Sequence, residues 1–517
     1  MLLRCVPRRR QGAEAGQVLP LTLAALMLGM VVVMPFVTQA GTTLIGSRNY
    51  GLIIKEGYAA DSGVEHAVWR LLDDGLEAVL LGVGSSTNYT LPQAVNGMTA
   101  DITVTKTSAG ETPAGAIVDT VIDTLEFDTS EGTAPRMAPV SGSVYAIGYT
   151  GPGSDGFIKT VTIATDGQIG DTAIDTLEFD TGTGIEVDII HVSGTTYAVA
   201  YRGSGSDGFI RTVTITADGQ IGDSVLDTLE FDTADGFQPR IIHVSGTTYA
   251  VAYRGSGSDG FIKTVTIGAD GQIGDTVIDT LEFDTADGFD PDIIHVAGDV
   301  YAIAYRGTGD DGFLVTVTVT AAGQIGNTVV DSLEYDTGNG ESPDIELVAA
   351  NVYLIAYLGP SNGGFLKTVE IAADGQITDA VIDSQQFDAV QGSEPSVLSI
   401  GNDLFAIAHR GDNSDGWVRT FEILPNGQIG NAEIDSLEFD TSDGFEPHLI
   451  TVASGVCAIA YRGVGSDGFV RTVSISLTGA ASSNTYEVQS VAGGCTVTAV
   501  VEITGGAPSL ISWVVQR

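Results

Sequence analysis

Most of the chain alternates apolar and polar residues with the period of two that is typical of β-strands. One stretch contains four such runs in succession, at residues 291–296, 300–306, 312–319 and 328–335. The runs are rich in β-branched and aromatic residues, and short turns rich in Gly and Asp separate them. The pattern therefore predicts a unit of four strands with no helix between them.

This four-strand unit is repeated along the chain with a constant period. Phe157 and Phe209 occupy the same place in the phrase Asp-Gly-Phe-Ile and are 52 residues apart. The same step connects seven copies, which carry Phe157, Phe209, Phe261, Phe313, Phe365, Trp417 and Phe469. A second phrase, Asp-Thr-Leu-Glu-Phe-Asp and its variants, also has seven copies, which carry Phe127, Phe179, Phe231, Phe283, Tyr335, Phe387 and Phe439. A period near 40–50 residues with several short strands per unit is typical of a β-propeller.

The order of the phrases predicts how the ring closes. Residues 121–129 match a lone fourth strand with no strands before it in its unit, and the last unit, 447–475, lacks a fourth strand. The two incomplete units together make one blade, and this pairing removes the exposed edges of an open array. We therefore predict a mainly β protein with a seven-bladed propeller over residues 120–476, closed by an N-terminal outer strand.

The N-terminal region has a different pattern. Residues 18–37 form an uncharged, mostly apolar run, preceded by Arg4, Arg8, Arg9 and Arg10. Twenty apolar residues in a helix span the roughly 30 Å of a bilayer core, and the arginines favour a cytoplasmic N-terminus. We expect a basic leader (1–17), a transmembrane helix (18–40) and a single-pass location in the cell membrane, with the propeller outside at the cell surface. A cleaved secretory signal is the alternative.

Helical spacing continues after the apolar run, and short strand-like segments flank the repeats. Ala60, Val64, Ala67 and Leu71 recur on one face of an expected helix over residues 41–82. The flanking segments are 83–119, which ends in a linker, and 477–517, which begins with one. Neither segment could bury a core alone. We expect them to form one small α+β module with the helix, into which the propeller is inserted; a separate C-terminal tail over 485–517 is the alternative.

The N-terminal sequence resembles type IV pilin-like proteins of the minor-pilin class. The resemblance covers about residues 8–75 and rests on the Gly-Gln-Val-Leu start at Gly16, the apolar helix and the continuation EGYAADSGVEHAVWRL at 56–71. It implies processing after Gly16 and packing with other pilin-like subunits. Family members often carry Glu at the fifth position after the processed Gly, where this chain has Leu21.

Charge limits the choice of partners. The chain has 22 Lys and Arg against 66 Asp and Glu, a net charge of −44. Nucleic acid is excluded as a partner, because binding to phosphates needs a basic surface. The charge is compatible with an exported, acidic surface.

The loops at one end of the predicted blades supply candidate binding residues. In propellers the loops that join the second to the third strand share a face with those that join the fourth to the first. Here this face would carry a ring of Arg and Asp: Arg202, Asp207, Arg254, Asp259, Arg306, Asp311, Arg410, Asp415, Arg462 and Asp467. Such a face could bind glycans or cations. Alternatively, each Arg pairs with the Asp of its own hairpin, as Arg202 would with Asp207.

Metal ligands are weakly indicated. Asp284, Asp287, Asp290 and Asp292 are dense enough to be calcium candidates, although their spacing is not the Asp-x-Asp-x-Asp-Gly pattern of calcium loops. The histidines of three repeats, His191, His243 and His295, make only part of a ring, and we expect them to be solvated in the channel. We expect no cofactor, and calcium is the alternative.

No catalytic motif is found in the sequence. A nucleophile elbow, an HExxH motif and a phosphate-binding Gly-rich loop are missing, and the repeated carboxylates follow the repeat symmetry. We therefore predict that the protein is not an enzyme but a membrane-anchored, surface-exposed pilin-like protein. Its propeller would serve adhesion or bind a glycan or protein ligand, in association with a pilus-like assembly. The alternatives are an exported propeller enzyme that acts on polysaccharide, and a structural spacer at the cell surface.

Overall fold

The computed structural model describes residues 47–73, 76, 80, 85–110, 113–478, 483–504 and 507–516. The chain divides into two compact units. The propeller unit is Pro113–Gly479, and the terminal unit combines Met1–Thr112 with Ala480–Arg517. Each unit is described separately below.

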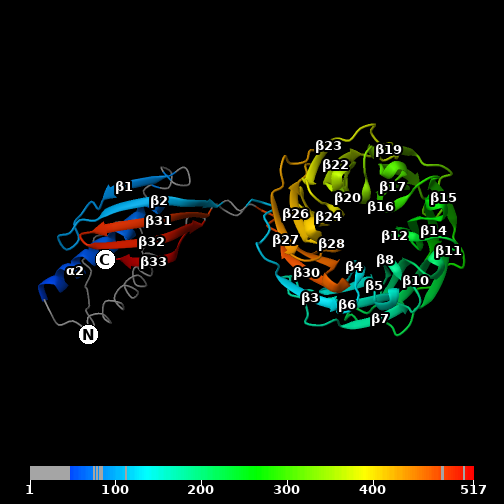
Figure 1. The fold of residues 1–517 in the computed structure, drawn as a ribbon, viewed down its shortest axis with the longest axis horizontal. Helices are drawn as coiled ribbons and strands as arrows, with labels where there is room; N and C mark the ends of the chain where they lie inside the picture. Colours follow the sequence, from blue (N-terminus) through cyan, green and yellow to red (C-terminus); the bar gives the residue numbers. More distant parts are fainter. Residues whose placement is uncertain are drawn as a thin grey trace, which may run out of the picture. The chain divides into compact units, whose positions relative to one another are not determined.

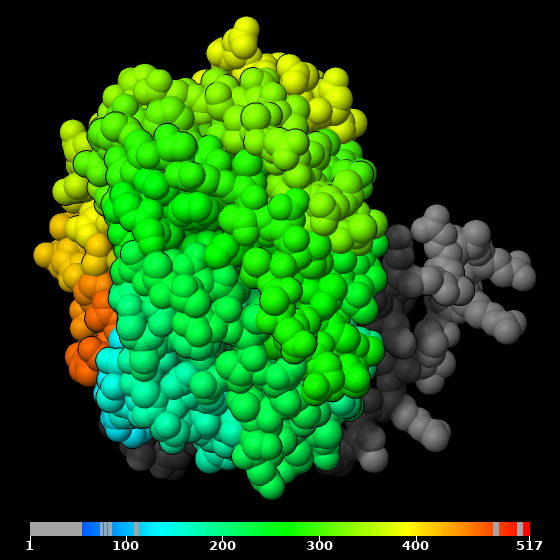
Figure 2. All heavy atoms as spheres, turned by 90° about the vertical axis from the view of Figure 1, so that its right-hand side faces the viewer, coloured from blue at the N-terminus to red at the C-terminus, as the bar shows by residue number. Residues whose placement is uncertain are grey.

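The propeller unit contains seven four-stranded antiparallel sheets, the blades, arranged in a ring (Figure 1). The first strands are nearest the centre: β4 (Thr133–Ser141), β8 (Ile185–Ser193), β12 (Phe237–Ser245), β16 (Phe289–Ala297), β20 (Glu341–Ala349), β24 (Ser393–Gly401) and β28 (Phe445–Ala453). The second strands are β5 (Val144–Thr150), β9 (Thr196–Arg202), β13 (Thr248–Arg254), β17 (Val300–Arg306), β21 (Val352–Leu358), β25 (Leu404–Arg410) and β29 (Val456–Arg462). Consecutive blades lie side by side along the rim, as the colour order in Figure 2 shows.

The outer half of each blade repeats in the same way. The third strands are β6 (Gly156–Thr162), β10 (Gly208–Thr214), β14 (Gly260–Thr266), β18 (Gly312–Thr318), β22 (Gly364–Glu370), β26 (Gly416–Glu422) and β30 (Gly468–Ser474). The fourth strands are β7 (Asp175–Asp180), β11 (Asp227–Asp232), β15 (Asp279–Asp284), β19 (Asp331–Asp336), β23 (Asp383–Asp388), β27 (Asp435–Asp440) and β3 (Asp123–Asp128). Short 3-10 turns join second to third strands: η1 (Pro152–Ser154), η2 (Ser204–Ser206), η3 (Ser256–Ser258), η4 (Thr308–Asp310), η5 (Pro360–Asn362), η6 (Asp412–Ser414) and η7 (Val464–Ser466).

The predicted closure of the ring is confirmed. Strand β3 pairs antiparallel with β30, so that Asp123 lies opposite Thr472 and Asp128 lies opposite Gly468. The last blade therefore takes three strands from the end of the repeat array and its outer strand from the beginning.

Each blade packs a face of large side chains against a face of small ones. Tyr197, Val199 and Tyr201 alternate along β9 with Ala198 and Ala200, because successive strand residues point to opposite sides of the sheet. The large residues join a buried cluster with alanines of the preceding blade, and the small ones join a cluster with the large residues of the following blade. This complementarity buries all these side chains and fixes the spacing of the blades.

Buried hydrogen bonds also join neighbouring blades. The central Thr of each third strand donates from Oγ1 to the carbonyl oxygen of a Gly in the next blade, as Thr264 does to Gly323 at 2.6 Å. In most blades the Asp that ends the fourth strand accepts from a Tyr and a Lys or Arg of the next blade, as Asp232 does from Tyr253 at 2.6 Å and Lys263 at 2.7 Å. Burial acts to raise the pKa of Asp232, but the hydrogen bonds from Lys263 and Tyr253 outweigh it and lower the pKa.

The terminal unit is one helix packed on one sheet. Its helix is α2 (Ser47–Asp73), and its strands, in spatial order, are β1 (Ser86–Thr90), β2 (Asp101–Gly110), β31 (Ser483–Ala492), β32 (Cys495–Thr504) and β33 (Ala507–Gln516). Val64 and Leu71 on the helix are buried against Ile102 and Val497 of the sheet. Strands from before and after the propeller segment therefore share one sheet and one core.

The expected membrane-spanning helix requires a correction. No helix in the described part of the chain is both long enough and apolar enough to cross a membrane, and α2 carries charged residues along its length. The leader (1–17), the helix over 18–40 and Gly16 lie outside the described residues. The predictions of a fold with a transmembrane helix and of a single-pass membrane location are corrected on this finding.

Candidate ligand site in the central channel

A cavity of about 440 Å³ lies among the first residues of the seven innermost strands. Most of its lining comes from two positions of each strand, the second and the fourth residue. The second residues form the mouth ring: Ala134, Glu186, Gln238, Asp290, Ser342, Glu394 and Glu446. The fourth residues form the inner ring: Arg136, Asp188, Arg240, Asp292, Asp344, Ser396 and His448, of which Ser396 lies outside the cavity lining.

A β-bulge at the start of each innermost strand aims these side chains. In the third blade the pairing jumps from Phe237 opposite Arg254 to Arg240 opposite Ala252, so Gln238 and Pro239 have no ladder partner. Proline is tolerated at such a position because no strand hydrogen bond needs its missing N–H. The mouth-ring residue has a positive φ in every blade: Ala134 (47°), Glu186 (57°), Gln238 (52°), Asp290 (50°), Ser342 (47°), Glu394 (52°) and Glu446 (52°).

This backbone conformation is costly for residues other than glycine. A left-handed residue with a side chain costs on the order of 1–3 kcal/mol and persists only where the surrounding structure enforces it. Bulges and strained residues of this kind gather at functional sites, where they direct side chains. Seven such residues at one end of one channel identify the channel cavity as the candidate site.

The mouth ring holds itself in place through hydrogen bonds between blades. Glu186 Oε2 accepts from the backbone N–H of Gln238 at 2.8 Å, and Glu446 Oε2 accepts from that of Ala134 at 2.8 Å. Glu394 does the same for Glu446 at 2.8 Å. Each of these side chains therefore supports the bulge of the next blade.

Inner-ring side chains, two residues further along each innermost strand, also accept hydrogen bonds from backbone N–H groups of the next blade. Asp188 Oδ2 accepts from the N–H of Ile241 at 2.9 Å, and Asp344 Oδ2 accepts from that of Val397 at 2.8 Å. His448 Nδ1 accepts from the N–H of Met137 at 3.0 Å. Arginine has no acceptor atom, so Arg136 and Arg240 cannot take part in this pattern.

Burial and crowding shift the titration of the inner ring. Burial, followed by repulsion from Arg240, lowers the pKa of Arg136 to about 10. Burial and then the neighbouring Asp292 raise the pKa of Asp344 well above its usual value. Burial and the two arginines lower the pKa of His448 well below its usual value, so this imidazole is neutral at pH 7.

The arginines expected on the ligand face turn toward the mouth ring. Arg202 Nε lies 3.3 Å from Glu186 Oε2, and Arg462 Nε lies 3.3 Å from Glu446 Oε2. Arg306 pairs with Asp290 at 3.7 Å, and Arg410 pairs with Glu394 at 3.6 Å. These arginines therefore form the rim of the channel cavity rather than a separate site.

Phenylalanines complete this rim. The guanidinium of Arg254 lies between the rings of Phe237 and Phe289, 4.0 and 4.6 Å from their centroids. Arg202 lies over the other side of Phe237 at 4.5 Å, and Arg306 lies over Phe289 at 4.4 Å. Arginine and phenylalanine thus alternate across three blades, held by cation–π contacts.

The aspartates expected beside these arginines face elsewhere. Asp207 acts on the Glu230 side chain on the fourth strand of its own blade: burial and then Asp207 raise the pKa of Glu230. Asp259, Asp415 and Asp467 contact the equivalent glutamates of their blades in the same way. Asp311 ends the turn η4. The expected Arg202–Asp207 pair does not form, because Glu186 is the partner of Arg202.

The calcium candidates do not converge on one point. Asp284 binds Tyr305 through Oδ2 at 2.7 Å and accepts from the N–H groups of Ala286 and Asp287 through Oδ1. Asp290 and Asp292 line the cavity instead. Within the described ranges no group of three or more His, Cys, Asp or Glu side chains could hold a metal ion.

The repeated histidines, which were expected to be solvated in the channel, are not among the residues that line the cavity. His191 is exposed, bonds the carbonyl of Gly194 in its own hairpin at 3.1 Å and packs edge-on against Tyr197. His243 and His295 repeat this arrangement.

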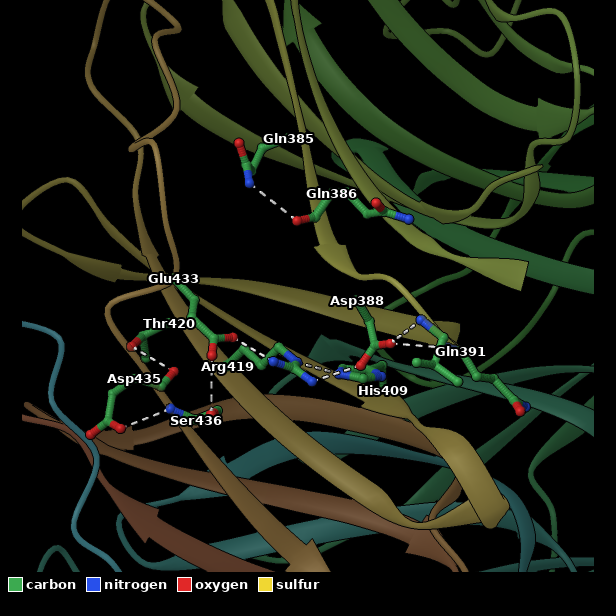
Figure 3. Close-up of polar contacts among 11 residues, drawn as sticks. Gln385, Gln386, Asp388, Gln391, His409, Arg419, Thr420, Glu433, Asp435 and Ser436 are labelled. Atoms are coloured by element: carbon green, nitrogen blue, oxygen red, sulfur yellow. Dashed lines mark hydrogen bonds and ion pairs between the residues drawn. The ribbon is translucent and has the colours of Figure 1, made fainter. Parts of the chain in front are cut away.

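One buried cluster between blades departs from the repeat (Figure 3). His409 occupies the place of the tyrosine of other blades, and its Nε2 accepts from Arg419 Nε at 3.0 Å. Arg419 also binds Asp388 at 2.6 Å and contacts Glu433. His409 is fully buried and does not line the cavity, so we interpret the cluster as structural.

Sequence reasoning found only part of the cavity. Asp290 and Asp292 were singled out as metal candidates, whereas Arg136, Arg240 and His448 were not considered. A signal was present: the residues on either side of the recurring proline differ from blade to blade, while the buried Thr and hairpin Gly positions barely change. Positions that break the repeat where the rest of the unit keeps it are candidates for contact with a single ligand.

Comparisons with known proteins add little to this picture. No protein-family model and no curated protein matches the sequence. Among solved structures, a proposed 6-phosphogluconolactonase from Bacteroides uniformis is 12% identical and aligns over 72% of this chain and 96% of its own, with a TM-score of 0.46. A triple arginine mutant of AofleA from Arthrobotrys oligospora (12% identity, 64% and 94% coverage, TM-score 0.38) and BBS1N in complex with ARL6DN (8%, 70% and 97%, 0.41) are also similar.

The prediction that the protein is not an enzyme is corrected by the first of these structures. That protein is itself described as an enzyme. At this level of similarity the comparison assigns no activity to the present chain.

Proposed function

We propose that the protein is a ligand-binding propeller whose channel cavity takes up one small polar molecule. The observation that supports this most directly is the lining of the cavity. All seven innermost strands begin with the same bulge, which has a positive φ at the second residue. The side chains at the fourth residue nevertheless differ between blades: they are Arg, Asp, Arg, Asp, Asp, Ser and His. A single ligand has no sevenfold symmetry, so a site that fits it must break the symmetry of the ring.

The size and chemistry of the cavity support the same proposal. Pockets for small molecules have volumes of about 300–1,000 Å³ and a few fixed polar groups, and this cavity has about 440 Å³. Its polar groups are held by hydrogen bonds to the next blade, so little ordering is needed when a ligand binds.

We propose further that the terminal unit is a pilin-like carrier of this propeller. One helix packed on an antiparallel sheet, with the propeller segment between two of its strands, supports the resemblance found in the sequence. Other pilin-like subunits would be its partners, in association with a pilus-like assembly.

The proposal is tested by a ligand screen on the full chain. Sugars, sugar acids, amino acids and polyamines are screened by thermal shift, and binders are quantified by calorimetry. The Ala134→Phe variant fills the cavity and should abolish binding, whereas Ala286→Phe, which adds the same bulk at an exposed site, should not. A binder that is insensitive to Ala134→Phe would place the site elsewhere, and the absence of any binder would refute the proposal.

A further inference from the structure

The cavity lining contains hydrogen-bond donors that have few partners in the protein, whereas each of its carboxylates accepts at least one hydrogen bond or ion pair. Seven carboxylates line the cavity, and every one of them has a partner in the protein: Glu186, Asp188, Asp290, Asp292, Asp344, Glu394 and Glu446. The two guanidinium groups of the lining have few partners. The chain as a whole carries −44, so this local excess of unsatisfied donors is a specific feature of the site.

Arg136 is the clearest case. Its guanidinium lines the cavity and, within the described part of the chain, makes no hydrogen bond or ion pair. Arg240 has only a long contact of 3.8 Å to Asp292 and one of 3.5 Å to the carbonyl of Pro239. Arginine presents five N–H donors, and leaving them unmatched in a protein cavity is unfavourable.

His448 adds a third donor on the same side. Its Nδ1 accepts a hydrogen bond from the backbone N–H of Met137, so in the neutral ring the proton is on Nε2. The ring lines the cavity, and Nε2 has no protein partner among the described residues. His448 and Arg136 belong to adjacent blades, and Arg240 follows two blades after Arg136.

The positions of these donors define where an anion would sit. Arg136 and Arg240 repel each other, and Asp188 lies between them in the ring with one oxygen used by Ile241. Asp188 attracts both guanidinium groups but makes no hydrogen bond to either of them among the described residues. An anionic group of the ligand between the two arginines would reduce their repulsion further and accept hydrogen bonds from them. The opposite arc of the ring consists of Asp292 and Asp344, which have acceptor capacity left for hydroxyl groups.

We propose that the ligand is a small organic anion that carries hydroxyl groups, such as a sugar acid or a sugar phosphate. Its anionic group binds Arg136, Arg240 and His448, and its hydroxyl groups donate to Asp292 and Asp344. This inference rests on the proposed function, because it assigns a chemical class to the ligand of the same cavity.

The experiment compares matched probes on the full chain. Glucuronate, galacturonate, gluconate and glucose 6-phosphate are titrated by calorimetry against neutral glucose and galactose and against the diamine putrescine. The anionic probes should bind at least tenfold more tightly than their neutral counterparts, and the affinity should fall as salt is raised. Tighter binding of the carboxylates or of the phosphate identifies which anionic group the site takes.

Variants locate the site. Arg136→Met and Arg240→Met keep the bulk of the side chain and remove its charge, and each should weaken the anionic probes roughly tenfold or more. Arg211→Met is the control, because Arg211 pairs with Asp180 between blades and does not line the cavity. Circular dichroism confirms that each variant is folded.

Two outcomes would overturn the inference, and only the second would also overturn the proposed function. If glucose or putrescine binds the cavity as tightly as the anionic probes, the anion assignment fails while ligand binding by the cavity stands. If no compound in this panel or in the broader screen binds, both proposals fail.

Discussion

The hydroxyl of Thr420 donates a hydrogen bond of 2.6 Å to the carbonyl oxygen of Gly115, a residue 305 positions earlier in the chain. Thr472 makes the same bond to Gly167, also 305 positions earlier, whereas in the other five blades the bond connects residues 59 positions apart, as between Thr264 and Gly323. Gly115, with a φ of 91°, therefore takes the place of the hairpin glycine that the last blade cannot supply. The ring is closed by the same bonds that join its other blades.

The hydrogen bond that closes the ring should contribute to the stability of the protein. Thr420→Val preserves shape but removes the donor, and it should lower the free energy of unfolding by about 1–2 kcal/mol because a buried carbonyl loses its partner. The matched control is Thr264→Val, which removes the same bond within the continuous array and should cost a similar amount. Urea denaturation measures both. A clear loss in Thr264→Val with none in Thr420→Val would mean that the closing interface does not contribute to stability.

A gap in the inter-blade ion pairs gives a second prediction. Val315 stands where other blades have Lys or Arg, so Asp284 binds Tyr305 but no cation. Lys263→Val should cost roughly 1–3 kcal/mol, because it leaves Asp232 buried without its charge partner. Val315→Lys should raise the free energy of unfolding by up to about 1 kcal/mol. Destabilisation by Val315→Lys would show that this blade interface has adapted to the apolar residue.

The buried His409 should make the stability of the protein depend on pH. Burial and the charge of Arg419 lower the pKa of His409 to about 4, below the ordinary 6.5. Because the pKa of His409 is lower in the folded than in the unfolded protein, its contribution to the free energy of unfolding is intact above pH 6.5 and is lost as the pH falls toward 4. His409→Tyr restores the residue of the other blades and its hydrogen bond to Asp388. It should stabilise the protein by about 1 kcal/mol at pH 7, and by roughly 2 kcal/mol more at pH 5.

The measurement for His409→Tyr is denaturant unfolding at both pH values. Among the described residues the buried Nδ1 of His409 has no hydrogen-bond partner, which is a second reason to expect a gain at neutral pH. A gain that is equal at pH 5 and pH 7 would show that His409 titrates normally in the folded protein.

The contribution of Glu346 to stability should have the opposite pH dependence. It is the sixth residue of its innermost strand, where the other blades have Ala138, Ile190, Ile242, Ile294, Leu398 and Ile450. Burial and the nearby Asp292 raise its pKa to about 7 from 4.5. Because the pKa of Glu346 is higher in the folded than in the unfolded protein, its contribution to the free energy of unfolding is intact below pH 4.5 and is lost as the pH rises through 7.

The Glu346→Gln variant tests this sign. It should match the wild type near pH 4.5 and be more stable by roughly 1–3 kcal/mol at pH 8, because the variant never has to bury a charge. Thermal or denaturant unfolding across this range measures the difference. An advantage that does not change with pH would show that packing rather than ionisation is the cause.

The sequence by itself determined the repeat, the number of blades and the closing strand. These follow from a strict 52-residue period and from one incomplete unit at each end, such as the lone strand that contains Phe127. It also determined the buried face of α2, since Val64 and Leu71 recur at helical spacing. Local periodicity is sufficient for such features because each is repeated many times or set by neighbours in the chain.

Only the tertiary structure decided what the residues at the channel do. From the sequence, Arg202 and Asp207 were neighbours in one loop and natural partners, but the bulge brings Glu186 from the adjacent strand to Arg202. Arg136, Arg240 and His448 each follow the recurring proline of their repeat, but they belong to three different blades, and the repeat pattern does not show that they line one cavity. They meet because ring closure places seven strand ends around one cavity, and a contact of that kind depends on the whole ring rather than on any one repeat.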